Sequence, residues 1–247
     1  IKNSCEINHM IQAHKKDGLA LTKFIYWIKN INKKIITEVD AQNKLEKFRK
    51  LNNDYLFPSF DTIAGTGSNG AIVHYRAIKK STKKINKKDI FLCDSGGQYR
   101  YGTTDVTRTI CFSSQKLYIK NAFTNVLKGH IAVALTNLNK DNTGKKIDIR
   151  ARKFLKKEGL DYAHGTGHGV GFFLNVHEGP QSISNYNSIK IQKGMILSNE
   201  PGFYKKNNFG IRIENLVYVN QLKNKLYFEN LTLAPIEKEL INYKLLN

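Results

Sequence analysis

The chain has 247 residues, of which 40% are hydrophobic and 11% aromatic, and this content supports one large core or two small ones. The mean hydropathy is −0.44, and no apolar run approaches the roughly 20 residues that cross a bilayer, which excludes a membrane-spanning protein. Three cysteines without a CxxC pair argue against a disulfide framework and against a structural zinc site, and they favour a reducing compartment.

The chain is strongly basic, because 40 lysine and arginine residues outnumber 20 acidic residues and give a formal net charge of +20. That charge alone would suit a nucleic-acid partner. Only 7 of the basic residues are arginine, however, and the lysines are scattered along the chain. Since arginine has the planar fork that reads phosphates and bases, we favour a solvated lysine-rich surface and expect no nucleic-acid or membrane partner.

The first half of the chain begins with two predicted helices and continues with strands. Residues 4–29 carry apolar side chains at helical spacing, with Ser4 as the expected N-cap. Thr37 and Asp40 form a capping-box pattern ahead of a second helix that runs through Lys50. From residue 60 to residue 112, short β-rich runs are broken by glycine and asparagine, which predicts strands and hairpins.

The second half repeats this order. Apolar positions over residues 117–138 predict a long helix, and a shorter helix is predicted after Asp148 and through Lys157. After Gly159 the β-rich segments return. Helices followed by strands, twice, predict an α+β fold of two similar halves, although the halves share no visible sequence repeat.

Four acidic residues lie in apolar, glycine-rich segments, in a chain where acidic residues are scarce. Asp94 follows IFLC, and Asp105 lies in TTDVTRTI. Glu200 precedes a proline in LSNEPG, and Glu214 lies inside IRIENLVYV. A carboxylate in a buried strand costs several kcal/mol unless a cation or hydrogen-bond donors compensate it. Four such acids therefore indicate a bound cation.

These acids are expected to converge. If residues 100–102 form the turn of a hairpin, Asp94 and Asp105 lie on adjacent antiparallel strands and can face the same side. In IRIENLVYV, strand alternation places Arg212 and Glu214 together, opposite the apolar residues. A histidine from HGTGHGVG would complete an oxygen-rich set with one nitrogen. Such a set suits manganese, cobalt or zinc in a two-metal hydrolytic site better than a closed structural zinc.

Other residues that could carry chemistry have a simpler structural interpretation. The segment GTGSNG lacks the Lys-Ser/Thr of a phosphate-binding loop, so we predict a turn beside the site. Cys93 and Cys111 are interpreted as core residues rather than nucleophiles. Three isolated histidines are interpreted as surface or core residues: His9, His14 and His130.

Several long segments, in the same order and spacing, resemble one known family. HGTGHGVGFFLNVHEGP, the EPG triplet, FGIRIEN, and DSGGQY followed by TTDVTRT resemble the catalytic domain of Xaa-Pro aminopeptidases (aminopeptidase P). These enzymes share the pita-bread fold with methionine aminopeptidase, prolidase and creatinase. The resemblance implies two pseudo-symmetric halves with a curved antiparallel sheet flanked by helices. It also implies that residues 1–247 are a single metallopeptidase catalytic domain, excised from a longer homodimeric protein whose N-terminal creatinase-like domains are absent.

The resemblance implies a dinuclear metal centre, with manganese as the expected metal and cobalt or zinc as alternatives. Asp105 and Glu214 match the ligands that bridge the two ions. A metal-bound hydroxide would attack the carbonyl carbon, and Glu200 would accept its proton and pass it to the proline nitrogen. The complete implied ligand set is Asp94, Asp105, His168, Glu200 and Glu214.

The resemblance also assigns residues that contact the substrate. His74 and His177 match the histidines that bind substrate and shuttle protons, so they are predicted to be catalytic together with Glu200. His164 and Arg212 match residues that line the proline side of the cleft. Four aromatic residues would either belong to the core or, in part, wall the proline pocket: Phe172, Phe173, Phe203 and Tyr204.

The implied activity is that of a metal-dependent exopeptidase that releases the first residue from peptides with proline in second position. Prolidase and methionine aminopeptidase are alternatives within the same group. A further alternative is a non-catalytic binding module for RNA, ribosomes or histones, although the presence of all five ligands favours an enzyme. No signal peptide opens the chain, so we expect a cytoplasmic protein.

Overall fold

The structure is a computed structural model that describes residues 1–31 and 35–246. Its order of elements occurs twice, because each half begins with a pair of helices and continues with short strands. The helix pairs are α1 (Ser4–Asn30) with α2 (Glu38–Arg49), and α3 (Leu117–Ala134) with α4 (Gly144–Lys157). The predicted α+β organisation in two similar halves is confirmed.

Each half contains a three-stranded antiparallel sheet. In the first half β3 lies between β2 and β6, and in the second half β12 lies between β13 and β9. Smaller sheets pair β1, β4 and β5, then β7 with β8, and β10 with β11. The strands are β1 (Tyr55–Pro58), β2 (Ile63–Thr66), β3 (Phe91–Ser95), β4 (Gly97–Tyr99), β5 (Gly102–Thr103), β6 (Val106–Ile110), β7 (Gly167–His168), β8 (Ser182–Ile183), β9 (Ile196–Asn199), β10 (Gly202–Lys205), β11 (Phe209–Arg212), β12 (Asn215–Leu222) and β13 (Lys225–Asn230). Short 3₁₀ helices are η1 (Gly67–Ala71), η2 (Lys238–Leu240) and η3 (Tyr243–Leu245).

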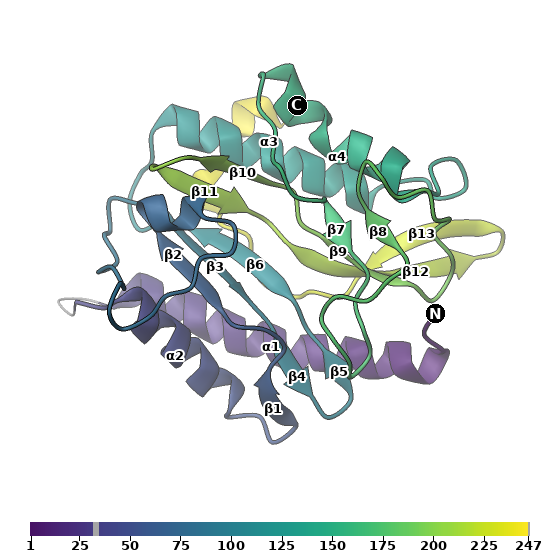
Figure 1. Ribbon diagram of the computed structural model, residues 1–247, viewed down its shortest axis with the longest axis horizontal. Helices are drawn as coiled ribbons and strands as arrows, with labels where there is room; N and C mark the ends of the chain where they lie inside the picture. The colour runs from purple at the N-terminus through teal and green to yellow at the C-terminus, as the bar shows by residue number, and fades with distance from the viewer. Residues whose placement is uncertain (32–34, 247) are drawn as a thin grey trace.

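The two helix pairs lie on opposite sides of the strands, α1 and α2 at the bottom of Figure 1 and α3 and α4 at the top. Phe24 of α1 and Leu45 of α2 pack in one cluster with Phe91 of β3. Val133 of α3 packs in another cluster with Leu197 of β9. Burial of each such side chain contributes about 1.5–3 kcal/mol, so the strands between the helix pairs form a rigid frame for residues at their ends.

The helix boundaries differ from the predictions where local capping signals compete. The N-cap of α1 is Asn3 rather than Ser4. The Asn3 side chain accepts a hydrogen bond from the Glu6 N–H, and the Glu6 carboxylate accepts one from the Asn3 N–H, which completes a capping box. The predicted capping box of Thr37 and Asp40 is confirmed for α2.

The later helices and the glycine-rich segment also differ in part from the predictions. The helix α3 ends at Ala134, earlier than predicted. The helix α4 begins at Gly144, so Asp148 is a buried residue inside it and not its start. Gly67–Ala71, in the predicted turn, forms the 3₁₀ helix η1. Within residues 1–31 and 35–246, no helix combines the length and the apolar content needed to cross a membrane.

Candidate metal centre

The first two carboxylates come from one antiparallel pair of strands. Asp94 lies in β3, Asp105 directly precedes β6, and the register pairs Ser95 with Val106. The connection between them is the predicted hairpin, since β4 and β5 pair and enclose residues 100–101. Asp94 is 8% exposed and Asp105 is 4% exposed. Both acids are therefore buried at the same end of the first sheet, as predicted.

The remaining predicted ligands come from the second half. His168 ends β7, Glu200 directly follows β9, and Glu214 lies between β11 and β12. Ser198 joins two of them, because its hydroxyl accepts the His168 N–H at 2.9 Å and donates to Glu200 Oε1 at 2.9 Å.

The strand predicted for IRIENLVYV is interrupted, which corrects the prediction. β11 pairs with β10, whereas β12 pairs with β9 and β13, so the chain changes sheet at Ile213 and Glu214. The backbone N–H of Glu214 donates instead to the Thr107 carbonyl of the first half at 3.2 Å. The break places the Glu214 carboxylate between the two halves.

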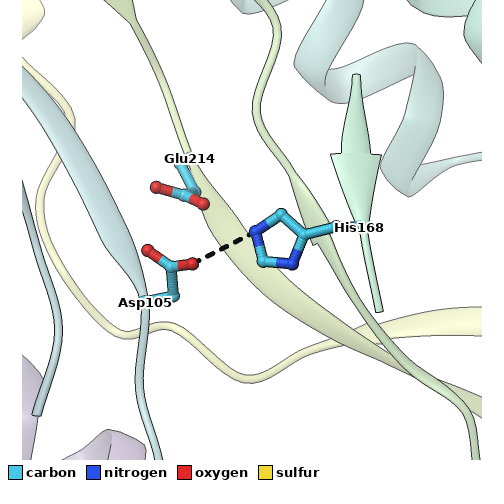
Figure 2. Close-up of side chains that lie close together, drawn as sticks. All are labelled: Asp105, His168 and Glu214. Atoms are coloured by element: carbon cyan, nitrogen blue, oxygen red, sulfur yellow. Dashed lines mark ion pairs between the residues drawn. The ribbon is translucent and has the colours of Figure 1, made fainter. Parts of the chain in front are cut away.

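The side chains of Asp105, His168 and Glu214 point toward one another (Figure 2), and their ligand atoms all lie within 4.8 Å of each other. His168 Nε2 lies 3.3 Å from Asp105 Oδ2 and 3.4 Å from Glu200 Oε1. Asp94 lines the same cavity, whose volume is about 390 Å³. The structure thus brings all five predicted ligands to one cavity.

Without a bound cation, the crowding of buried carboxylates in this cluster is unfavourable, and it shifts their pKa values. Burial raises the pKa of Asp105 to about 6, even though the hydrogen bond with His168 opposes the shift. Burial and the neighbouring carboxylates also hold the pKa of Glu214 well above its ordinary value. Burial lowers the pKa of His168, but the hydrogen bond with Asp105 and the charge of Glu200 outweigh it and raise the pKa to about 9.

The donor set fits divalent cations. Asp94 Oδ1 is buried and accepts no hydrogen bond from the described part of the chain. The four carboxylates supply hard oxygen ligands, and the imidazole supplies one nitrogen ligand. Manganese, cobalt or zinc accepts this mixture in an open site. Bound cations would compensate the carboxylates whose pKa values the protein raises.

Arg212 lines the cavity as predicted, but its guanidinium is held by protein groups. It donates to Asp94 Oδ2 at 2.6 Å, to the Tyr204 hydroxyl at 2.6 Å and to Thr107 Oγ1 at 3.1 Å. Thr107 in turn donates to Glu214 Oε2 at 2.7 Å. Arg212 therefore orients two predicted ligands, Asp94 directly and Glu214 through the Thr107 hydroxyl.

The sequence could predict some of the residues that surround the candidate ligands but not others. Thr107 and Asp105 are two apart in TTDVTRT, so strand alternation predicts that both face the cavity. Ser198 had no comparable signal. The same is true of Asp61 and Arg76, two largely exposed residues that line the cavity and form an ion pair at 2.8 Å.

The three predicted substrate-contacting histidines also line the cavity, namely His74, His164 and His177. His177 packs against the predicted ligand His168, with ring centroids 4.0 Å apart and planes at 67°. Burial and the charge of His168 lower the pKa of His177. His164 Nε2 lies 2.9 Å from the Tyr204 hydroxyl, which connects it to Arg212.

The residues interpreted as structural lie outside this cavity. Cys93 is 1% exposed, and burial raises the pKa of its thiol to about 12, which excludes a thiolate nucleophile near neutral pH. His130 is buried, with Nδ1 at 3.1 Å from the Asn199 carbonyl. His9 stacks on Tyr101, with ring centroids 5.0 Å apart.

Comparison with known proteins shows one consistent similarity. Residues 8–221 match metallopeptidase family M24. A probable Xaa-Pro aminopeptidase P of Pyrenophora teres f. teres is 45% identical over 260 residues, covering 100% of this chain and 40% of that protein. One from Aspergillus niger is 46% identical over 261 residues, covering 100% of this chain and 42% of that protein. The chain thus spans about two fifths of the length of these relatives.

Solved structures show the same relationship. An X-prolyl aminopeptidase of Caenorhabditis elegans, described as a cytosolic enzyme with a di-nuclear active site, superposes with a TM-score of 0.93 at 37% identity, covering 99% of this chain and 41% of that one. The prolidase of Pyrococcus furiosus gives a TM-score of 0.81 at 29% identity, covering 94% of this chain and 65% of that one. These similarities confirm the expected pita-bread fold.

Proposed function

We propose that this chain, which belongs to metallopeptidase family M24, is the catalytic domain of a metal-dependent Xaa-Pro aminopeptidase. It would release the N-terminal residue from peptides whose second residue is proline. One observation carries the proposal, which is the convergence of four carboxylates and His168 on one cavity. Relatives that share 45% and 46% of its residues over its whole length are probable Xaa-Pro aminopeptidases P.

The residues that would hold two divalent ions are the five predicted ligands. Asp105 and Glu214 come from the two halves and face each other (Figure 2), and by resemblance to the family they would each serve both ions. Divalent ions, when bound, supply Lewis acidity that activates water and polarises a carbonyl. We propose manganese, with cobalt or zinc as alternatives.

Glu200 would act as the general base. Its carboxylate lines the cavity and is 16% exposed, and the Ser198 hydroxyl fixes Oε1. Glu200 would accept a proton from the attacking water and return it to the proline nitrogen. That second step matters, because the bond before proline is a tertiary amide whose nitrogen carries no hydrogen and must be protonated to leave.

His177 and His74 would stabilise the carbonyl oxygen as negative charge develops on it. The lowered pKa of His177 keeps its imidazole neutral at physiological pH, so one ring N–H can donate a hydrogen bond. An interaction of this kind, stronger in the transition state than in the ground state, contributes about 3 kcal/mol in comparable sites. His164 and Arg212 would line the proline side of the cavity.

A prolidase activity is the second candidate, since the Pyrococcus furiosus prolidase shares the fold. The two activities differ in substrate length. An aminopeptidase should cleave Xaa-Pro-Yaa peptides, whereas a prolidase should cleave only Xaa-Pro dipeptides. The test is to supply both substrate classes, and a Met-Ala-Yaa peptide, to the manganese-loaded protein, with Glu200→Gln as the inactive control. Exclusive cleavage of the dipeptide would contradict the proposal.

The cellular setting is part of the proposal. We propose a cytoplasmic protein, supported by the cytosolic relative from Caenorhabditis elegans. We also propose that residues 1–247 act as one catalytic domain and that the full-length protein is a homodimer acting on peptides, without nucleic-acid or membrane partners. Size-exclusion chromatography with light scattering on the full-length protein tests the homodimer.

A further inference from the structure

His177 lies at the end of an excursion between β7 and β8. The excursion, residues 170–177, begins after Gly169 and is closed by a hydrogen bond from the Glu178 N–H to the Gly169 carbonyl at 2.7 Å. It contains a second turn, where the Gly171 N–H donates to the Asn175 carbonyl at 3.2 Å and Phe173 has a φ of 51°. Irregular backbone of this kind does not by itself hold a side chain in one place.

A single side chain from the other end of the sequence joins both ends of this loop. The Lys2 ammonium donates to the Val170 carbonyl at 2.6 Å and to both carboxylate oxygens of Glu178 at 3.0 Å. The Lys2 side chain is 5% exposed, and that of Glu178 is 29% exposed. Val170 is the first residue of the loop, and Glu178 directly follows His177.

Burial makes this contact stronger than a surface ion pair. A surface pair contributes about 0–1 kcal/mol, because water screens it and its long side chains lose freedom. Lys2 is the buried member of this pair and Glu178 is partly exposed, so water screens the contact less than it screens a surface pair. The Lys2 backbone is fixed independently, since its N–H donates to the Gly194 carbonyl at 2.8 Å. A substitution of the side chain therefore leaves the chain anchored.

A second contact holds the same loop to α1. The His9 ring stacks on the rings of Tyr101 and Phe172, with centroids 5.0 Å and 6.4 Å away and interplanar angles of 26° and 19°. Phe172 belongs to the loop, and Tyr101 belongs to the β4–β5 turn. Lys2 thus contacts the two ends of the loop, and His9 of α1 contacts it at one point along its length.

We propose that Lys2 is a positioning residue for His177, because its ammonium clamps the two ends of the loop and fixes the His177 imidazole over the metal centre. The catalytic consequence rests on the proposed function, in which His177 donates to the carbonyl oxygen. The clamp itself is a property of the fold, and it links a residue before α1 to a side chain 175 positions away.

The test compares Lys2→Met with Lys29→Met in the manganese-loaded protein. Lys29 lies in the last turn of α1, about 40 Å from Lys2 along the helix, and forms an ion pair with Glu237 at 2.6 Å. Lys2→Met should lower kcat on the order of tenfold to a hundredfold, as expected when a reacting group is misplaced by about 1 Å. KM and bound metal should not change, and Lys2→Arg, which keeps a cation, should restore part of kcat. Lys29→Met should keep the parent kcat.

A double-mutant cycle with Glu178→Gln shows whether the pair acts as a unit. If it does, the double variant should lose no more kcat than the worse single variant. Losses that multiply would overturn the clamp, as would an unchanged kcat in Lys2→Met or an equal loss in Lys29→Met. The double variant buries no unpaired charge, so it can be measured in place of Lys2→Met if that single variant folds poorly.

Hydrogen exchange separates this proposal from the proposed function. Amide exchange in residues 170–178 should accelerate in Lys2→Met and remain at the parent rate in Lys29→Met. If the parent protein cleaves no Xaa-Pro peptide, the proposed function fails, but the exchange rates still decide whether Lys2 restrains the loop. Unchanged exchange in Lys2→Met would overturn the proposal whatever the activity.

Discussion

The substitution Asp105→Asn should stabilise the metal-free protein and abolish its stabilisation by metal. Burial raises the pKa of Asp105 from its ordinary value of 3.8 to about 6, so the folded state holds the proton more tightly than the unfolded state does. The contribution of Asp105 to the free energy of unfolding therefore falls as the pH rises from about 4 to about 6 and stays constant above that range. A neutral asparagine removes this penalty.

The size of the effect follows from the pKa difference. About two pKa units correspond to about 3 kcal/mol at pH 7.5, and for a chain of this size that is roughly 6–12 °C in Tm. At pH 5 the folded carboxyl is mostly protonated, so the advantage of the variant should fall to about half. Saturating manganese should reverse the order, because bound ion stabilises only a folded state that can hold it.

The assay is thermal unfolding of the parent and Asp105→Asn proteins, in chelator and in manganese, at pH 7.5 and pH 5. Asp141→Asn is the control, because the Asp141 carboxylate is paired with Arg150 near the surface, away from the metal centre. The reasoning is refuted if Asp105→Asn melts at or below the parent Tm in chelator at pH 7.5. It is also refuted if the variant gains as much Tm from manganese as the parent does.

Three further substitutions test other parts of the site and the fold. His177→Ala should keep the bound metal and the Tm but lose about a hundredfold in kcat, since the substitution removes an interaction made in the transition state. If the variant loses metal, His177 is a ligand and the prediction is contradicted. Glu214→Gln should lower metal stoichiometry and kcat more than Asp94→Asn does, because a bridging carboxylate serves two ions, and equal losses would contradict the bridge. Arg49→Met should cost about 3–5 kcal/mol of unfolding free energy in a denaturant titration, because the buried Asp17 carboxylate, now 2.7 Å from the guanidinium, loses its counter-ion and keeps only the hydrogen bond from the Tyr99 hydroxyl. A loss below about 1 kcal/mol would contradict this.

The convergence of the candidate ligands on one cavity could be predicted because its signals are local. Acids are rare in this chain, so Asp94 in a buried strand and Asp105 next to one stand out, and the intervening turn was sufficient to align them. The capping box at Thr37 is equally local, since its partner lies three residues away. The prediction of Ser4 as the N-cap of α1 was wrong, because Asn3 and Ser4 are both competent caps and only the Glu6 side chain selects between them.

The remaining features depend on contacts between distant segments. The break at Glu214 exists because β11 and β12 pair with different strands. The Lys2–Glu178 ion pair joins residues 176 positions apart, and no periodicity connects them. Ser198 joins His168 and Glu200 only after β7 and β9 lie side by side, as the bridge between Gly169 and Leu197 shows.

Metal content and peptidase activity, measured on one preparation before and after chelation, test the central claim most directly. We predict two divalent ions per chain, release of the first residue from Xaa-Pro-Yaa peptides, loss of that activity with the metal, and its return with manganese. Full activity in excess chelator, with no metal detected by elemental analysis, would contradict the account.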